Sequence, residues 1–557
     1  MAVFCPRAEH DSLPVIPDDL TISQFVFEYE APFKPHRDPD APCFIEAETG
    51  RRLYASDVAR LTSALANGLR AQWGIDYPII IWAVHKLGGI ISPANPVYTA
   101  NELAHQFEIA KAKAVIASVS ALPAATAAAK KAGISMSHVA CLPSAEEMAP
   151  QGILTVQDLI QAGNREKKQY QERRFEPGEA KTKVALLAFS SGTTGKFCAV
   201  VITHYAVIAN LCQLCSYWRT DLPDGGRFHL GDSVAAVLPF FRQFLLISSS
   251  RAFWKLFRNI GSHCCREHHI RGLYENNFIM SHNSLVPPQI VLLCKSPLTR
   301  SYDLSSVRTV MASGAPMSAE IVNQLTTVVP GAWVIQGYGM TETVVIITVM
   351  PFIKGVSTPG SAGRLINGLS IKIIKDAGGL AKENEPGEIY CRGLSFASGY
   401  LNNEKATKET FLDDGWLRTG DVGYMKNDEL FVIDRAKELI KVRSFQVSPA
   451  ELEGHLLTHP AVNEVCVVGA ADDYSGEVPV AFVVLKPEFA QKVSAHSDML
   501  KQLEQDIIKY VADNKSRFKW LAGGVRFVDA IPKNPTGKML RRALRDEVNR
   551  TRAKARL

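Results

Sequence analysis

The chain has 557 residues, of which 46% are hydrophobic and 21% are charged, and its formal net charge is +6. This length is too great for one hydrophobic core, so we expect a globular protein with two or more domains. The small positive charge gives no indication of a nucleic-acid partner. The 11 cysteines are odd in number and lack C-x-x-C spacing, which favours reduced thiols in an intracellular protein over a disulfide framework. The N-terminus lacks the apolar stretch of a signal peptide, and charged residues or prolines interrupt the most apolar windows, so we expect no membrane span.

The first third of the chain predicts alternating helices and strands. Residues 1–50 are rich in proline and predict loops, with an apolar patch at 22–27. Helical spacing or alanine-rich composition predicts helices over 54–69, 79–87, 100–110 and 121–132, and a short apolar run predicts a strand at 115–117. This alternation favours an α/β domain with a largely parallel sheet.

The apolar run at 184–189 predicts a buried strand that breaks into a polar, glycine-containing segment. The segment consists of Ser190, Ser191, Gly192, Thr193, Thr194, Gly195 and Lys196. Glycines let the backbone turn sharply, and the exposed N–H groups and hydroxyls can surround an anion. This is the chemistry of a phosphate loop, although the spacing is not that of the Walker motif. Taken alone, the segment is equally compatible with a polar surface loop.

The middle of the chain is less regular. A helix is predicted over 201–214 and a buried strand over 234–238, but residues 242–284 show no clear period. Within that stretch, the adjacent pairs Cys264–Cys265 and His268–His269 do not match the usual ligand spacings of zinc, so we do not expect a metal site there.

Regular patterns return after residue 286. They predict a helix over 318–329, a strand at 334–335, and a β-rich subdomain with strands at 371–374, 388–391 and 430–433. The pattern changes again after Asp434 and Arg435. The last 120 or so residues have the length of one small α+β domain, with helices predicted over 449–457 and 499–511 and strands over 465–468 and 480–485.

Five motifs occur in one order along the chain, at residues 190–195, 336–342, 419–421, 434–438 and 535–538. Supporting stretches lie at 93–96, 286–289 and 444–451. Together they resemble the adenylate-forming superfamily of acyl-CoA synthetases, luciferases and carrier-loading adenylation domains. The resemblance is greatest to the fungal-type 4-coumarate–CoA ligase-like acyl-CoA ligases, and it covers about residues 40–545.

The resemblance implies an α/β fold with two domains. Residues 1–434 would form a large N-terminal AMP-binding domain of parallel αβ sheets plus a β-rich subdomain, and residues 435–557 a small, mobile α+β lid. It also implies an acid–CoA ligase that uses ATP and Mg²⁺ to make an acyl-AMP and then transfers the acyl group to CoA. The expected acid is aromatic or of medium to long chain, with a role in secondary metabolism.

The resemblance also assigns roles to residues, position by position. Ser190 to Gly195, with Lys196, would hold the phosphates, and Gln336, Gly337, Tyr338 and Gly339 the nucleotide, with Tyr338 against the adenine. Thr341 would touch the α-phosphate, Glu342 would bind Mg²⁺, and Asp421 and Arg435 would bind the ribose. Lys538 would reach the carboxylate and α-phosphate, assisted by Lys441 and Gln446. The acyl pocket would be lined by Phe241, Arg242, Ser313, Gly314, Ala315, Gly337 and Val344.

Three departures from the family pattern qualify this expectation. Cys198 stands where a lysine follows the phosphate loop, no strand is present between Gly74 and Asp76, and Arg242 replaces a histidine at the start of the dissimilar stretch 242–284. An error in the gene sequence is the simplest interpretation of the last two; if both regions are real, an altered or inactive enzyme is expected. Two alternatives therefore stay open: a luciferase-like or carrier-loading adenylase, and a non-catalytic nucleotide-binding relic.

The last three residues, Ala555, Arg556 and Leu557, resemble the Ser-Lys-Leu peroxisomal address. They predict peroxisomal localisation through the import receptor; otherwise a cytoplasmic protein is expected.

Overall fold

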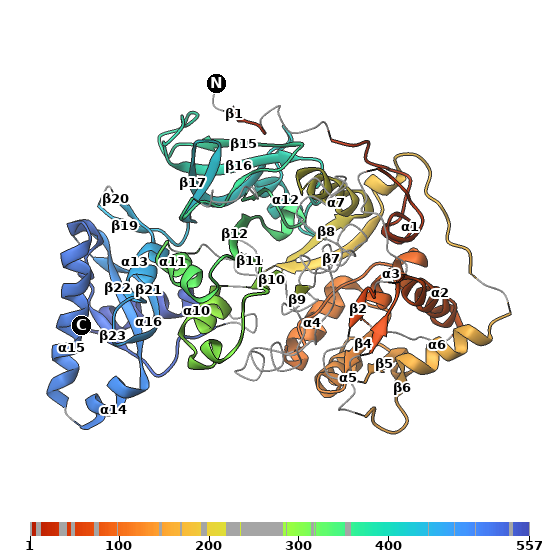
Figure 1. Cartoon of the computed structure of the whole chain (residues 1–557), viewed down its shortest axis with the longest axis horizontal. Helices are drawn as coiled ribbons and strands as arrows, with labels where there is room; N and C mark the ends of the chain where they lie inside the picture. Colours follow the sequence, from red (N-terminus) through yellow and green to blue (C-terminus); the bar gives the residue numbers. More distant parts are fainter. Residues whose placement is uncertain are drawn as a thin grey trace.

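The structure is a computed structural model. It describes residues 3–6, 13–32, 40, 42–45, 51–71, 77–96, 98–143, 148–167, 170–190, 198–218, 234–235, 282–285, 287–312, 317, 319–350, 358–443, 445–472, 474–495, 497–533 and 539–555. The chain passes from N-terminal helices with small sheets, through a large mixed sheet, to a C-terminal α+β unit at the opposite end of the molecule (Figure 1).

The N-terminal part consists of helices around small sheets. The helices are α1 (Ile22–Phe27), α2 (Ala55–Ala71), α3 (Tyr77–Lys86), α4 (Ala100–Ala110), α5 (Leu122–Lys131) and α6 (Val156–Arg165). The strands are β2 (Phe44–Ile45), β3 (Arg52–Leu53), β4 (Val115–Ser118), β5 (Val139–Leu142) and β6 (Leu154–Thr155). β4, β5 and β6 form a parallel sheet, which confirms the parallel α/β arrangement expected for this region.

Helices α2 and α6 approach each other closely because each carries a glycine at the contact. A Cβ atom on Gly68 would lie 1.9 Å from the Leu159 carbonyl oxygen, and one on Gly163 would lie 1.7 Å from the Ala64 carbonyl oxygen. No side chain fits at either position without separating the helices.

Two sequence predictions need correction here. The apolar patch at 22–27 is helix α1, whose first turn is closed by reciprocal hydrogen bonds between Thr21 and Gln24. The helix predicted over 201–214 begins later, because Val201 to Thr203 belong to strand β8 (Cys198–Thr203) and helix α7 spans His204–Trp218. The β-branched residues of β8 pair antiparallel with β7 (Val184–Ser190), the predicted buried strand.

The largest sheet joins the two regions that the sequence predicts separately. Its order is β1-β15-β16-β17-β18-β14-β13-β12-β11-β10-β9. The strands are β1 (Val3–Phe4), β9 (Val234–Ala235), β10 (His282–Leu285), β11 (Thr309–Ala312), β12 (Trp333–Tyr338), β13 (Thr348–Val349), β14 (Arg364–Leu365), β15 (Leu369–Ile374), β16 (Gly387–Gly393), β17 (Leu417–Lys426) and β18 (Glu429–Arg435). Pairing is parallel from β9 to β12 and antiparallel from β12 onward, so β12 is the strand at which the two parts meet. Three helices lie beside this sheet: α10 (Pro287–Lys295), α11 (Ala319–Val328) and α12 (Glu404–Thr410).

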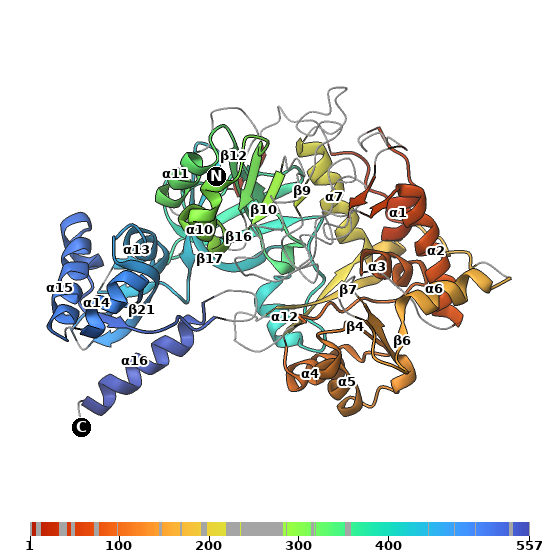
Figure 2. The same ribbon diagram turned by 60° about the horizontal axis from the view of Figure 1, so that its bottom comes forward.

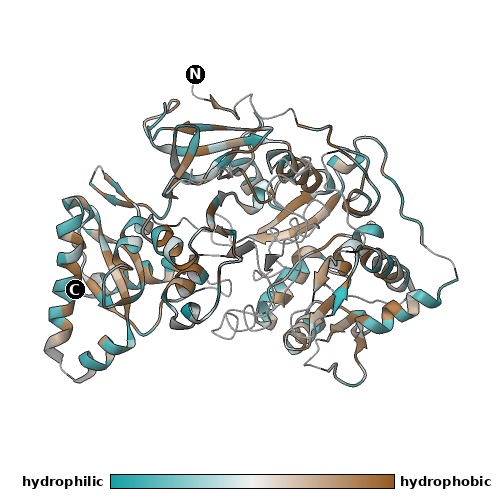
Figure 3. Cartoon of the chain, in the orientation of Figure 1, coloured by the Kyte–Doolittle hydropathy of each residue, from teal (hydrophilic) through white to brown (hydrophobic). Residues whose placement is uncertain are grey.

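The C-terminal part has its own sheet and core. The strands are β19 (Ile440–Val442), β20 (Phe445–Val447), β21 (Val462–Asp472), β22 (Gly476–Leu485) and β23 (Val525–Phe527), and the helices are α13 (Pro449–Leu456), α14 (Pro487–Ala495), α15 (Ser497–Asn514) and α16 (Arg541–Ala555). Hydrophobic residues concentrate on β21 and β22, while α15 carries both hydrophobic and hydrophilic residues (Figure 3). The fold is therefore α/β with a C-terminal α+β unit, as the sequence predicts.

The C-terminal part is held against the large sheet at described contacts. Lys295 on α10 donates from Nζ to the carbonyl oxygens of Val462 and Asn463, at 3.4 and 3.2 Å. Asp434, near the end of β18, accepts at Oδ2 a hydrogen bond of 2.9 Å from the hydroxyl of Ser448, the residue that caps α13. No helix in the described segments is long and apolar enough to cross a membrane.

Two buried histidines lie together between α3, α7 and α1. The His85 ring is fully buried, with Nε2 3.1 Å from the Ala185 carbonyl oxygen, and its centroid is 5.1 Å from that of His204. His204 Nδ1 accepts a hydrogen bond of 3.0 Å from the Ile22 N–H. Burial lowers the pKa of His85 to about 4 and that of His204 to about 2. Both rings are therefore neutral in the folded protein at physiological pH.

We expect thermal stability to fall as the pH is lowered from about 6.5 toward 4. In this window an unfolded histidine binds a proton that folded His85 does not, so the unfolded state binds more protons and acid favours it. The difference in the pKa of His85 corresponds to about 3 kcal/mol of unfolding free energy. Melting temperatures of the wild type and His85→Asn across this range measure the effect. An equal pH slope in the two proteins would contradict it.

Candidate active site

Three polar residues from separate predicted motifs meet where the last residues of β12 and β18 lie beside the middle of β17. The Tyr338 hydroxyl donates to Asp421 Oδ2 at 2.7 Å. Asp421 and Arg435 are directly opposite each other on β17 and β18, with Arg435 Nε 3.7 Å from Asp421 Oδ1. Burial raises the pKa of Tyr338 well above its usual value, and the charge of Asp421 raises it further. Tyr338 is therefore a fixed hydrogen-bond donor, and Asp421 a carboxylate whose orientation is set from two sides.

The segment after β12 turns tightly and buries a carboxylate. Glu342 lies in a 3₁₀ turn, Thr341–Thr343, and its side chain accepts a hydrogen bond of 2.9 Å from the Tyr400 hydroxyl. Only 4% of Glu342 is exposed. Burial and the charge of Glu342 raise the pKa of Tyr400, so that this hydroxyl also stays protonated. A buried carboxylate with a fixed donor is poised to hold a cation or a polarised group.

The backbone at this turn is specialised. Val344 and Val345 have φ values of 53° and 105°, in the region that favours glycine, and such a conformation in β-branched residues is strained. A Cβ on Gly339 would lie 1.7 Å from the Val345 carbonyl oxygen, so only glycine fits there. Val344 itself is fully buried in the core. The turn that presents Thr341 and Glu342 thus depends on Gly339.

The ends of the predicted phosphate loop lie close to Glu342. Ser190 pairs with Cys198 across β7 and β8, so the two ends of segment 191–197 are held together. Cys198 is buried, and the side-chain amide of Asn403 donates to its sulfur at 3.9 Å. Burial raises the pKa of the Cys198 thiol, and the nearby charge of Glu342 adds to the increase. Where the family pattern has a cation, this chain therefore has a neutral thiol.

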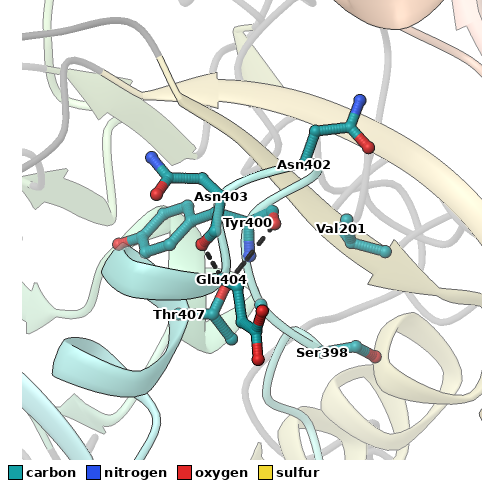
Figure 4. Close-up of a pocket in the computed structure, with 8 residues that line it drawn as sticks. Val201, Ser398, Tyr400, Asn402, Asn403, Glu404 and Thr407 are labelled. Atoms are coloured by element: carbon teal, nitrogen blue, oxygen red, sulfur yellow. Dashed lines mark hydrogen bonds between the residues drawn. The ribbon is translucent and has the colours of Figure 1, made fainter.

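A pocket of about 500 Å³ opens on the outer side of the Tyr400 backbone. It is lined by Val201, Ser398, Gly399, Tyr400, Asn402, Asn403, Glu404 and Thr407. The Tyr400 ring points away from Val201 and Ser398 (Figure 4), and Thr407 Oγ1 accepts a hydrogen bond of 3.0 Å from the Tyr400 N–H. The pocket therefore lies on the side of Tyr400 opposite to its ring, whose hydroxyl contacts Glu342. Thr407 fixes the backbone of Tyr400.

Two further predicted residues are neighbours in the C-terminal part. Lys441 and Gln446 are directly paired across β19 and β20. The Gln446 side-chain amide donates to the carboxylate of Asp376, on the turn after β15. The structure thus places Gln446 beside the turn that follows β15. The main-chain N–H of Lys441 donates to Glu477 at 2.8 Å.

Several predicted site residues lie outside the described residues. They are Ser191, Gly192, Thr193, Thr194, Gly195, Lys196, Phe241, Arg242, Ser313, Gly314, Ala315 and Lys538, together with the junction at 72–76, the four Cys and His residues at 264–269 and the C-terminal Arg556 and Leu557. For Ser190, only the backbone is described. In the segments that the structure covers, no group of three or more His, Cys, Asp or Glu side chains could hold a metal ion.

Sequence reasoning missed Tyr400, Asn403 and Asp376. Tyr400 is 58 residues from Glu342, which accepts a hydrogen bond from its buried hydroxyl. The sequence carries no signal for such a pairing, because it depends on how β8 pairs with the segment around Gly399.

Comparison with known proteins gives one consistent result. Residues 33–401 match the model of the AMP-binding enzyme family, and residues 451–538 match that of the AMP-binding enzyme C-terminal domain. The chain is 32% identical to 4-coumarate--CoA ligase-like 1 of Arabidopsis thaliana, over 97% of this chain and 96% of that protein. It is 33% identical to 4-coumarate--CoA ligase CCL1 of Humulus lupulus, over 95% and 94%.

Solved structures share the fold. The anthranilate CoA ligase AuaEII in complex with anthranoyl-AMP superposes with a TM-score of 0.78 at 21% identity, covering 97% of this chain and 99% of that one. ATP-bound MatB from Rhodopseudomonas palustris gives 0.75 at 23% identity, covering 95% and 99%. The family-model match, the relatives that align over nearly their whole length, and the contacts among Tyr338, Asp421 and Arg435 all point to one family. The chain belongs to the AMP-binding enzyme family.

Proposed function

We propose that this protein is an ATP-dependent, AMP-forming acid–CoA ligase. The observation that carries the proposal is the hydrogen bond between Tyr338 and Asp421, which joins two family motifs 83 residues apart. The curated relatives named as 4-coumarate--CoA ligases match nearly the whole chain, which supports CoA as the acceptor.

The reaction has two steps. A carboxylate oxygen attacks the α-phosphorus of ATP, the bond to pyrophosphate breaks, and an acyl-AMP forms. The thiol of CoA then attacks the acyl carbon, AMP leaves, and the thiol proton is lost. Both steps bring anions together, so the protein must orient them and neutralise charge.

The described residues suit these tasks. Asp421, oriented by Tyr338 and Arg435, accepts hydrogen bonds from the ribose hydroxyls. Thr341 contacts the α-phosphate. Mg²⁺ is commonly bound by one or two carboxylates together with the phosphate oxygens of the substrate. The buried carboxylate of Glu342 suits this role. Bound Mg²⁺ supplies neutralisation of the phosphate charge.

Further residues, many of them outside the described segments, complete the proposal. Ser190 to Gly195 and Lys196 cradle the phosphates, and Lys538 approaches the carboxylate and α-phosphate, with Lys441 and Gln446 in support. Phe241, Arg242, Ser313, Gly314 and Ala315, together with Gly337 and Val344, surround the acyl group. The small side chains at 312–315 favour a bulky acid, aromatic or of medium to long chain, as in secondary metabolism.

The deciding experiment is acid-dependent exchange of labelled pyrophosphate into ATP. We expect exchange with at least one member of a panel of cinnamic, phenylacetic and fatty acids, and a thioester on addition of free CoA. Exchange without thioester would indicate a luciferase-like or carrier-loading adenylase. No exchange with any acid, from soluble folded protein, would leave the nucleotide-binding relic that the buried, neutral Cys198 suggests.

We also propose that the protein is imported into peroxisomes through Ala555, Arg556 and Leu557. The proposal is tested with a fluorescent protein fused to the N-terminus, which leaves this tripeptide free. Peroxisomal fluorescence that becomes cytoplasmic on deletion of the tripeptide is expected, and cytoplasmic fluorescence of the intact fusion would contradict the proposal.

A further inference from the structure

A buried arginine sits on the helix that follows Lys538. Helix α16 packs against β21 and leads away from the large sheet, with the C-terminus at its tip (Figure 2). Its first residue, Arg541, has a side chain that is only 15% exposed. Arg541 Nη2 donates to Glu453 Oε2 at 2.6 Å, and Nη1 donates to Glu438 Oε2 at 3.0 Å. One guanidinium thus bridges two carboxylates from different segments.

The two carboxylates differ in what they contribute. Glu453, on α13, is almost completely buried, and its Oε1 also accepts the Val467 N–H at 2.9 Å. Burial opposes the charge of Arg541, but Glu453 and Glu438 outweigh it and raise the pKa of the guanidinium. Glu453 is therefore the partner that lets Arg541 be buried. Glu438 is more exposed, at 22%, and neutralisation of Arg541 does not depend on it alone.

Glu438 belongs to the segment that leaves the large sheet. It lies three residues after Arg435, whose carbonyl oxygen accepts its N–H at 2.9 Å. Helix α16 holds this segment a second time, because Arg545 Nη1 donates to the Lys437 carbonyl oxygen at 3.1 Å. The first turns of α16 are thus fastened to residues 437 and 438.

The residues that flank segment 534–538 are fixed on the same body. Lys533 and Met539 form an antiparallel bridge, and the Leu540 N–H donates to the Pro532 carbonyl oxygen at 2.8 Å. Lys533 Nζ also donates to Glu464 Oε2 on β21 at 2.6 Å. Both ends of the segment that contains Lys538 are therefore set by described contacts.

We infer that Glu438 and Arg541 are a positioning pair that couples the segment after β18 to the helix after Lys538. The pair makes one rigid unit of residues 437–438 and the start of α16. A rotation of the chain at Asp434 and Arg435 then moves the residues that flank segment 534–538 together with residues 437–438. The inference rests on the proposed ligase function and adds two residues to it, neither of which contacts the substrates.

The test is Glu438→Gln, assayed in the two half-reactions separately. A displacement of about 1 Å at a reacting group can cost on the order of 100-fold in rate, so we expect pyrophosphate exchange to fall about 10- to 100-fold. Thioester formation from supplied acyl-AMP and CoA does not use Lys538 and is expected to stay within about 2-fold of the wild type, with a similar melting temperature. Glu438→Asp, which keeps the charge, is expected to restore part of the exchange.

A matched control is Arg542→Gln, on the next residue of α16, whose side chain is 80% exposed and pairs within the helix with Asp546. It should leave both half-reactions unchanged. Arg541→Gln is less useful as a test, because it leaves Glu453 buried without its cation and endangers folding. Equal loss of both half-reactions in Glu438→Gln, or no loss of exchange, would overturn the positioning role. No exchange by the wild type would instead defeat the ligase proposal, and with it this role.

Discussion

Replacing Glu342 with glutamine is expected to reduce acid-dependent pyrophosphate exchange by about 100- to 1,000-fold, the usual cost of losing one preorganised charge-stabilising group. The substitution removes the negative charge that is proposed to hold Mg²⁺ against the phosphates. It keeps the side-chain length, and the amide oxygen can still accept the Tyr400 hydroxyl, which lies 2.9 Å from Glu342. The fold should therefore persist while the chemistry is lost.

Two variants control this result. Tyr400→Phe removes the hydrogen bond but leaves the charge, so its exchange rate should fall less than that of Glu342→Gln. Glu404→Gln removes an exposed carboxylate of α12, with 81% side-chain exposure, and should have no effect. Exchange rates measured over a range of Mg²⁺ concentrations give the decisive comparison. Wild-type rates and Mg²⁺ dependence in Glu342→Gln would refute the role of this carboxylate.

Replacing Lys538 with alanine is expected to lower exchange by about 1,000-fold or more, because one positioned cation stabilises the charge that develops during adenylation. The same variant should still convert supplied acyl-AMP and CoA into thioester at close to the wild-type rate. Lys538 is assigned to the first step alone, so the two half-reactions should separate. Single-turnover assays with synthetic acyl-AMP measure the second step independently of the first.

A lysine of the same part of the chain provides the control. Lys509 on α15 has a side chain that is 71% exposed and pairs with Asp513, one helical turn away. Lys509→Ala should preserve both half-reactions, since exposed pairs of this kind contribute little to stability. If Lys538→Ala slowed both half-reactions equally, its assignment to adenylation would be wrong.

Local sequence patterns predicted many of the elements. Helix α4 begins and ends where its spacing indicates, because Thr99 caps its start and Lys111, in the left-handed conformation, caps its end. Local patterns failed where strand pairing determines the secondary structure. Residues 201–203 begin a run with helical spacing, but they pair with β7 and form part of a strand. Strand β17 was not predicted, since its alternation is interrupted by the glycines at 420 and 423.

The candidate site was predictable only through the family motifs. Nothing in the residues themselves indicates that Tyr338 reaches Asp421, or that Arg435 faces it, since these contacts follow from the order of strands in the large sheet. The contacts of Tyr400 with Glu342, and of Arg541 with Glu438, cannot be derived from either motif order or spacing. They join segments 58 and 103 residues apart whose approach depends on tertiary packing.

The adjacency of Asp434 and Arg435 on β18 has an energetic consequence. Arg435 contacts Asp421, while the preceding residue, Asp434, binds the cap of α13 through Ser448. A ligand that changes the Asp421–Arg435 contact therefore acts on a residue next to the one that holds the C-terminal unit. Free-energy coupling between ligand binding and the orientation of the C-terminal unit is reciprocal. If ligand binding favours one orientation by a given factor, that orientation raises the affinity for the ligand by the same factor. A measured nucleotide affinity therefore depends on the orientation of the C-terminal unit, and a ligand that changes this orientation must also change the nucleotide affinity.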